Sequence, residues 1–274
     1  MDKWIAVIGG GVGRKAPLGP IEEVRSPGFT ATLFAPRLKV FPHTPLERGL
    51  SMLAYLDAGI EAEKAGYDAV FINTCGDYGI DEMRSALRIP VTGAGEATYA
   101  LAATVGRRFS IVKIWPPRMN FITEGVLKAS RHTERCVSIR NVLKDDEVVS
   151  TSTAVAHIGA MQEHNQGIID RTMAQIQRAV DEDGADSIVL GCTCMAAIGP
   201  AIRERSPVPV LEPMRTGYKV AEIGLSLGLR QTSRVTYPRA NPGLLGAVDD
   251  MVSHMRNREL SASCDMCVVA EAAE

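Results

Sequence analysis

The sequence predicts an α/β protein with two lobes, each a small parallel sheet covered by helices. Short β-rich apolar runs alternate along the chain with longer segments of helical period, which is typical of βαβ units. Strands joined by helices of this length can only be parallel neighbours. One pattern of strand, loop and helix from the first half also recurs in the second half. These observations together predict two related halves.

The first half begins with a βαβ rhythm. Three apolar runs bounded by glycine, proline or polar residues are predicted to be strands: 4–8, 30–34 and 69–72. Thr44, Pro45 and Glu47 form a capping-box start for a helix between the second and third run. This helix is predicted to end at Gly66. Four apolar residues are predicted to recur on one face of this helix: Leu46, Leu50, Leu53 and Ile60.

The second half repeats the rhythm. Residues 109–114 and 187–190 are predicted to be strands, and the helix before the second of these ends at Gly184. Four residues are predicted to line one face of that helix: Ile169, Met173, Ile176 and Val180. Residues 231–245 are polar and contain proline and glycine, which indicates a linker to a last helix near 247–258.

An internal repeat relates the two halves. Residues 66–75 (GYDAVFINTC) show the same order of residue types as residues 184–192 (GADSIVLGC): a glycine, an aspartate, an apolar run and a cysteine. The second copy is one residue shorter. A helical stretch and then a Pro-Val pair follow each copy. Helices are predicted over roughly 80–88 and 195–205. Both halves therefore place a cysteine, Cys75 or Cys192, just past the carboxyl end of a strand.

We expect three parts in the chain. The first lobe covers 1–98 and takes back a return segment at 211–230. The second lobe covers 99–210. Residues 231–274 form the linker, a C-terminal helix and a tail.

Composition excludes several classes of function. The chain has 274 residues, with 30 Lys and Arg against 32 Asp and Glu, so it lacks the basic excess of a nucleic-acid-binding surface. No apolar run approaches the roughly 20 residues that cross a bilayer, and no signal-peptide pattern opens the chain, so we expect a cytoplasmic protein without a membrane partner. The six cysteines and five histidines show no zinc-site spacing, so no metal is expected.

Cys75 and Cys192 have the setting of catalytic thiols. Ligands of open parallel sheets bind beyond the carboxyl ends of the strands, where both residues stand. The start of a helix after each one favours an anion and makes a thiol easier to ionise. If the lobes face each other across a cleft, two close thiols share one proton. One then removes a proton beside a carbonyl and the other returns one to the opposite face, with no cofactor.

Several further residues are candidates for substrate binding. Asn73, Thr74 and Thr193 flank the thiols and carry hydrogen-bonding groups, although such residues also cap turns. The glycine run 9–13 lacks dinucleotide-binding spacing and is read as a substrate-facing turn. Glu96 and Glu212 are interpreted either as supporting groups of the site or as helix-start carboxylates. The remaining candidates are Gly10, Gly76, Asp77, Lys113 and Cys194.

The motifs resemble a known family. Residues 73–79 (NTCGDYG), 90–97 (PVTGAGEA) and 190–195 (LGCTCM) resemble the hydantoin and allantoin racemase branch of the aspartate/glutamate racemase superfamily. The resemblance covers most of 60–230 and implies two Rossmann-like lobes in pseudo-twofold relation. It also implies an active site in the cleft between them, catalysis by Cys75 and Cys192 without a cofactor, and a homo-oligomer. The branch usually has glycine at the position of Cys194 and threonine at that of Lys113.

The leading hypothesis is a cofactor-independent racemase or epimerase acting on a small molecule. Its substrate is expected to be a hydantoin- or allantoin-type ureide or an amino acid derivative. Two other reactions use the same scaffold: decarboxylation of a malonate-type acid and cis–trans isomerisation of a dicarboxylate. A third hypothesis is a non-catalytic two-lobed binding protein, or a thiol-redox protein that uses Cys192 and Cys194.

Overall fold

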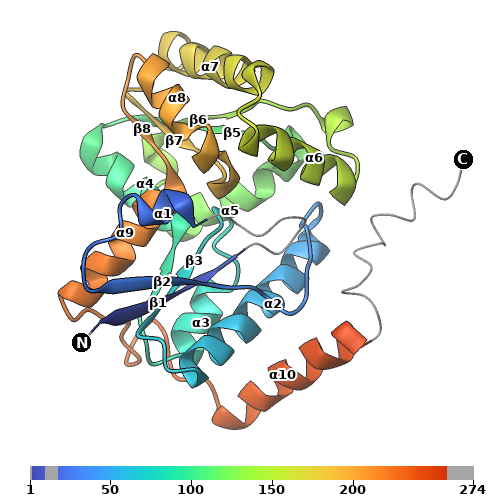
Figure 1. Ribbon diagram of the computed structural model, residues 1–274, viewed down its shortest axis with the longest axis vertical. Helices are drawn as coiled ribbons and strands as arrows, with labels where there is room; N and C mark the ends of the chain where they lie inside the picture. The colour runs from blue at the N-terminus through green and yellow to red at the C-terminus, as the bar shows by residue number, and fades with distance from the viewer. Residues whose placement is uncertain (1, 10–17, 258–274) are drawn as a thin grey trace, which may run out of the picture. The chain divides into compact units, whose positions relative to one another are not determined.

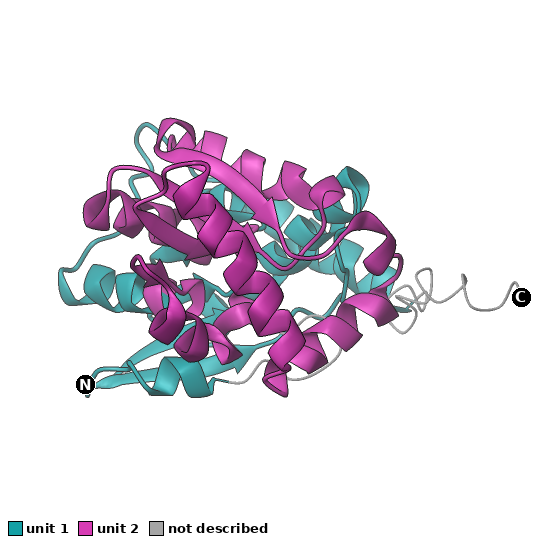
Figure 2. Cartoon of the chain, turned by 90° about the horizontal axis from the view of Figure 1, so that it is seen from above, with its two compact units in different colours: residues 1–73, 77–93, 218–274 teal, residues 74–76, 94–217 magenta. Residues whose placement is uncertain are grey.

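The structure, a computed structural model, describes residues 2–9 and 18–257 (Figure 1). The chain divides into two compact units. The first holds residues 1–73, 77–93 and 218–274, and the second holds 74–76 and 94–217 (Figure 2). Each unit contains one four-stranded sheet, so the α/β class predicted from the sequence is confirmed.

The sheet of the first unit has the order β2-β1-β3-β4, and all its pairs are parallel. Three of its strands match the predicted runs: β1 (Lys3–Ile8), β2 (Phe29–Phe34) and β3 (Ala69–Ile72). The fourth strand, β4 (Val91–Gly93), begins at the valine of the first Pro-Val pair. The centre of the sheet is fully buried, since Ile5 to Ile8 and Val70 to Ile72 are 0% exposed.

Helices α1 (Gly19–Glu22), α2 (Pro45–Lys64) and α3 (Ile80–Ala86) belong to the same unit. The capping box of α2 is confirmed: the Thr44 hydroxyl accepts from the Glu47 N–H, and the Glu47 carboxylate accepts from the Thr44 N–H. Leu46, the first residue of the predicted apolar face, is 74% exposed. The buried stripe of α2 centres on alanines at 54, 58 and 62, and position 46 lies at its edge in the first turn.

The last described helix, α10 (Pro242–Asn257), starts earlier than the sequence predicts and packs on α2. Arg37 ties the two helices together. Its guanidinium bonds the buried Asp57 of α2, with Nε to Oδ2 at 2.9 Å, and reaches Asp249 of α10 at 2.5 Å. Val252 of α10 is 0% exposed, so this helix is part of the core of the first unit.

The sheet of the second unit has the order β6-β5-β7-β8 and is also parallel throughout. The predicted strands appear as β5 (Phe109–Lys113) and β7 (Ser187–Leu190). Two further strands complete the sheet, β6 (Cys136–Asn141) and β8 (Val210–Leu211). No described helix is both long and apolar enough to cross a bilayer.

The helices of the second unit are α4 (Ala94–Val105), α5 (Asn120–Ala129), α6 (Thr151–Gln162), α7 (Gln166–Asp181) and α8 (Gly199–Arg205). Helix α9 (Pro213–Ser226) continues from this unit into the first. Short 3-10 turns occupy Pro117–Met119, Thr133–Arg135, Asp145–Glu147 and Thr193–Ala197. The helix predicted over 195–205 is thus a 3-10 turn followed by α8, because Pro200 is placed at the helix start.

The two sheets share one strand order. In chain order, each sheet is arranged second, first, third, fourth. The cysteine-bearing copies of the repeat therefore follow equivalent strands, β3 and β7. Each of these strands lies beside the first strand of its unit, where the chain reverses its direction of winding. Such a reversal is where open α/β sheets bind ligands.

Candidate active site

The carboxyl ends of β5 and β7 form the frame of the candidate site. Val112 pairs with Leu190, and the Gly191 N–H donates to the Val112 carbonyl at 2.8 Å. Lys113 ends β5, and Gly191 leads from β7 into Cys192. Lys113 therefore stands beside Gly191, the residue before Cys192, at the ends of adjacent parallel strands.

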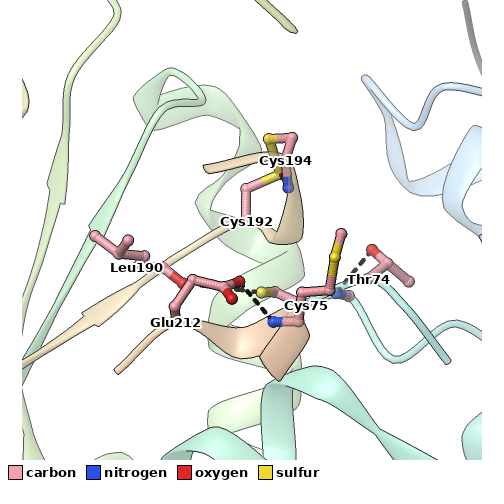
Figure 3. The surroundings of a disulfide bond; sticks show 8 residues. Thr74, Cys75, Leu190, Cys192, Cys194 and Glu212 are labelled. Carbon is pink, nitrogen blue, oxygen red and sulfur yellow. Dashed lines mark hydrogen bonds between the residues drawn. A yellow bond between two sulfur atoms is a disulfide. The ribbon is translucent and has the colours of Figure 1, made fainter. Parts of the chain in front are cut away.

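Cys75 reaches the same strand end. The segment 74–76 belongs to the second unit, and the Cys75 thiol lies 4.0 Å from the Leu190 carbonyl oxygen. Cys75 is in the thiol form and is 8% exposed. The Thr74 hydroxyl accepts from the Gly76 N–H at 3.3 Å, which shapes the turn around the thiol (Figure 3). Cys75 and Cys192, two predicted site residues that are far apart in sequence, thus both lie at the carboxyl end of β7.

Cys192 differs from the expectation of a titratable thiol, because its sulfur is bonded to Cys194 (Figure 3). Cys192 is extended and caps the Thr193–Ala197 turn, which brings the two Cα atoms to 5.2 Å. This separation lies within the range for disulfides. The Cys194 N–H also donates to the Cys192 sulfur at 3.2 Å. Figure 3 shows the Cys75 thiol turned toward Leu190 and the Cys192 side chain turned toward Cys194.

Lys113 is a buried cation, 2% exposed. Its Nζ donates to the Met119 carbonyl at 3.1 Å and to the Thr123 hydroxyl at 3.0 Å, both neutral acceptors. Burial lowers the pKa of Lys113 to about 8, against the opposing effects of the Cys75 thiolate and of Glu124. An ammonium has three N–H donors, and these bonds use two of them.

Glu212 serves as a helix-start carboxylate, one of the two roles left open by the sequence. It is 2% exposed and accepts from the N–H groups of Met214 at 2.6 Å and Arg215 at 3.1 Å. The Arg215 guanidinium adds an ion pair at 3.0 Å. Burial nevertheless raises the pKa of Glu212. This residue fixes the start of α9 after β8.

The remaining candidates divide between the units. Thr193 is buried in the turn after Cys192. In the first unit, Asn73 is 5% exposed, and its N–H donates to the Ile8 carbonyl at 2.8 Å. Asp77 is buried against Gly93, with a left-handed φ of 42° that few residues other than glycine adopt. Gly10 lies outside the described residues.

Sequence reasoning missed the two groups that hold Lys113 in place. Met119 and Thr123 come from a 3-10 turn and from α5, and neither carries a motif. No local pattern signals them, because only the packing of α5 brings them to Nζ. The Cys-x-Cys spacing, in contrast, is a visible signal for the disulfide.

Comparison with known proteins identifies the family. The family model described as Asp/Glu/Hydantoin racemase matches residues 33–221. The chain belongs to this family. It is therefore an isomerase of the racemase type, as the sequence motifs predict.

Curated members of the racemase family align with most of the chain. The hydantoin racemase of Rhizobium meliloti is 32% identical over 193 residues, which cover 69% of this chain and 72% of that protein. The hydantoin racemase of Paenarthrobacter aurescens is 30% identical over 174 residues, which cover 63% and 67%.

Solved structures share the racemase fold. The allantoin racemase of Pseudomonas fluorescens is 24% identical, with a TM-score of 0.74 over 88% of this chain and 97% of that chain. An arylmalonate decarboxylase is 19% identical, with a TM-score of 0.53 over 85% and 96%. At these identities the likeness extends to the fold alone.

Proposed function

We propose that this racemase inverts a carbon beside a carbonyl with two cysteines, Cys75 and Cys192, as its acid and base. The observation that carries this proposal is the approach of the Cys75 thiol to the Leu190 carbonyl, two residues before Cys192. It brings both cysteines to the end of one strand, where substrates of this type of sheet bind. We further propose a hydantoin-type cyclic ureide as substrate, which the curated hydantoin racemases support.

The working form is the one in which Cys192 is reduced. Two adjacent thiolates repel, so one cysteine is a thiolate and the other a thiol. The thiolate takes the proton from the stereocentre, and the electron pair of the C–H bond moves into the adjacent carbonyl as an enolate. The opposite thiol then returns its proton to the other face of the carbon. The two cysteines have exchanged protonation states, ready for the reverse direction.

Lys113 supplies the positive charge for this reaction. Within the described part of the chain, the buried ammonium bonds two neutral acceptors. Such a cation favours an anion nearby, and the developing enolate and the cysteine thiolate are both anions. Its Cβ packs against the glycine that precedes Cys192, so the charge is held close to the reacting end of β7.

The test is solvent exchange at the stereocentre. Reduced enzyme is incubated in deuterated water with 5-substituted hydantoins, allantoin and free amino acids, and label and optical rotation are followed. We expect label and loss of rotation with a hydantoin, and a fall of roughly 10²- to 10⁴-fold for Cys75→Ser and for Cys192→Ser alike. Cys136→Ser, which removes a half-buried thiol on β6, is the matched control. Full activity in either site variant contradicts the two-cysteine mechanism.

A second candidate, decarboxylation of a malonate-type acid, is favoured by one observation. With Cys192 in a disulfide, Cys75 is the one cysteine in the thiol form that the described residues place at the end of β7. Loss of carbon dioxide leaves an enolate that needs a single proton donor. This reading predicts release of carbon dioxide from an arylmalonate by Cys192→Ser protein at the unchanged rate.

A further inference from the structure

We propose that Cys192 and Cys194 form a thiol–disulfide exchange site for low-molecular-weight disulfides, and that oxidation at this site switches off the acid–base cysteine. The switching rests on the proposed function of Cys192, whereas the exchange site does not. The structure holds the two sulfurs in a covalent bond, within a single turn of the chain.

The disulfide removes the chemistry that the reaction needs. A disulfide sulfur has no S–H to donate and no thiolate to accept a proton, so an oxidised Cys192 can act neither as acid nor as base. The bond also turns the Cys192 side chain toward Cys194 (Figure 3). Oxidation therefore affects one partner of the proposed pair and leaves Cys75 as a thiol.

Exposure distinguishes the pair from the other thiol of the site. Cys192 and Cys194 are each partly exposed, whereas Cys75 is buried at 8%. A small disulfide can approach the first two from solvent. The Cys194 N–H that donates to the Cys192 sulfur also stabilises a thiolate at that atom, which is the reactive form in exchange.

The turn geometry favours closure of the ring. Cys192 is extended, and the 3-10 turn that starts at Thr193 folds position 194 back, so the Cα atoms lie 5.2 Å apart. Three residues of this turn are buried: Thr193, Met195 and Ala196 are 7%, 0% and 3% exposed. Because this packing fixes the backbone, the two thiols of the reduced protein remain close enough to react with each other.

The exchange proceeds in two balanced steps. The thiolate of one cysteine attacks a disulfide such as oxidised glutathione, one S–S bond breaks, and one glutathione thiolate leaves and takes up a proton. The second cysteine then loses its proton and attacks the sulfur of the first. This closes the Cys192–Cys194 bond and releases a second glutathione. The two thiols are oxidised by two electrons, the small disulfide is reduced by two, and a dithiol reverses both steps.

Mass mapping tests the exchange site without reference to catalysis. The full chain is incubated with oxidised glutathione or with a dithiol, then alkylated and digested with trypsin. Residues 179–203 form one tryptic peptide with no cysteine other than the pair, and the tail cysteines at 264 and 267 fall in a different peptide. We expect this peptide to be unalkylated and two hydrogens lighter after oxidation, and doubly alkylated after reduction. A pair that stays reduced in excess oxidised glutathione overturns the proposal.

Proton exchange at a hydantoin then tests the switch. We expect the oxidised enzyme to fall to the rate of Cys192→Ser protein, and a dithiol to restore the rate. Cys194→Ser protein cannot close the ring, so we expect oxidised glutathione to leave a mixed disulfide at Cys192, seen as one added glutathione on the 179–203 peptide in place of the loss of two hydrogens. A Cys264→Ser/Cys267→Ser protein should respond as the unaltered chain does, which assigns the effect to the pair.

The outcomes separate the two proposals. The switch is overturned if the reduced enzyme and the oxidised enzyme, whose disulfide is verified by mass, exchange the substrate proton at equal rates. A reduced enzyme that labels none of the substrates contradicts the proposed function and the switch with it, and the mass map still decides the exchange site.

Discussion

Gly191 has no room for a side chain, because a Cβ at this position would stand 2.4 Å from the Cβ of Lys113 and 2.9 Å from the Ile111 side chain. The absence of a side chain at 191 lets β5 and β7 run close together at the point where the chain turns toward Cys192. The buried lysine and the cysteine of the candidate site are therefore positioned by the same close contact.

We expect Gly191→Ala to destabilise the protein by about 1–3 kcal/mol, because β5 must shift to admit the methyl group. The proton-exchange rate should fall further than the folded fraction. Urea unfolding and the exchange assay measure the two effects. Gly246→Ala, in α10 with no atom within 4 Å of its added methyl group, is the control and should stabilise by about 0.5–1 kcal/mol. Wild-type stability in the Gly191 variant contradicts the close packing of the strands.

We expect the burial of Lys113 to lower the stability of the fold at neutral pH. Burial lowers its pKa from 10.5 in the unfolded chain to about 8, so the unfolded state binds more protons between these values. The resulting loss of folding free energy is fully present below pH 8 and disappears as the pH rises through 10.5. We expect Lys113→Met to gain about 1–2 kcal/mol at pH 7, after the loss of two hydrogen bonds, and to lose that advantage near pH 10.

The same Lys113 variant should lose proton exchange at a hydantoin, so stability and activity change in opposite directions. Urea unfolding at pH 7, 9 and 10, together with the exchange assay, measures both. If the variant is less stable than the unaltered chain at pH 7, burial of the ammonium does not destabilise the fold.

Glu212 caps α9 through bonds from Met214, Arg215 and the Arg215 guanidinium. We expect Glu212→Ala to lower stability by about 1–3 kcal/mol, because the first N–H groups of the helix lose a buried acceptor. Glu82→Gln, an exposed carboxylate in the first turn of α3, should change stability by less than about 0.5 kcal/mol. Thermal unfolding of both proteins makes the comparison, and equal melting temperatures would refute the capping role.

Arg37 fastens α10 to α2 by bonding Asp57 and Asp249. Replacement by methionine leaves Asp57 as a buried charge without its cation, so we expect a loss of about 3–5 kcal/mol. Hydrogen exchange should rise first in residues 242–257. Lys64→Met, which removes an exposed ion pair with Glu61 on the same helix, is the matched control. Unchanged protection of α10 in the Arg37 variant contradicts this attachment.

Much of the fold could be predicted from local pattern. The strands at 69–72 and 187–190 were recognisable because each is a short apolar run ended by polar residues, and the start of α2 carries its own capping box at Thr44. The exposure of Leu46 could not be predicted so directly. Helical spacing defines a stripe, but the position of the sheet beneath the helix decides where that stripe ends.

The sequence by itself determined the α/β class, the repeated strand and loop that place Cys75 and Cys192 after equivalent strands, and the racemase motifs. These follow from short-range pattern and from residue chemistry. Only the tertiary structure decided that Cys75 approaches Leu190 and that Lys113 is buried among neutral acceptors. The physical reason is that burial, proximity and charge depend on which segments pack together, and no spacing along one chain contains that information.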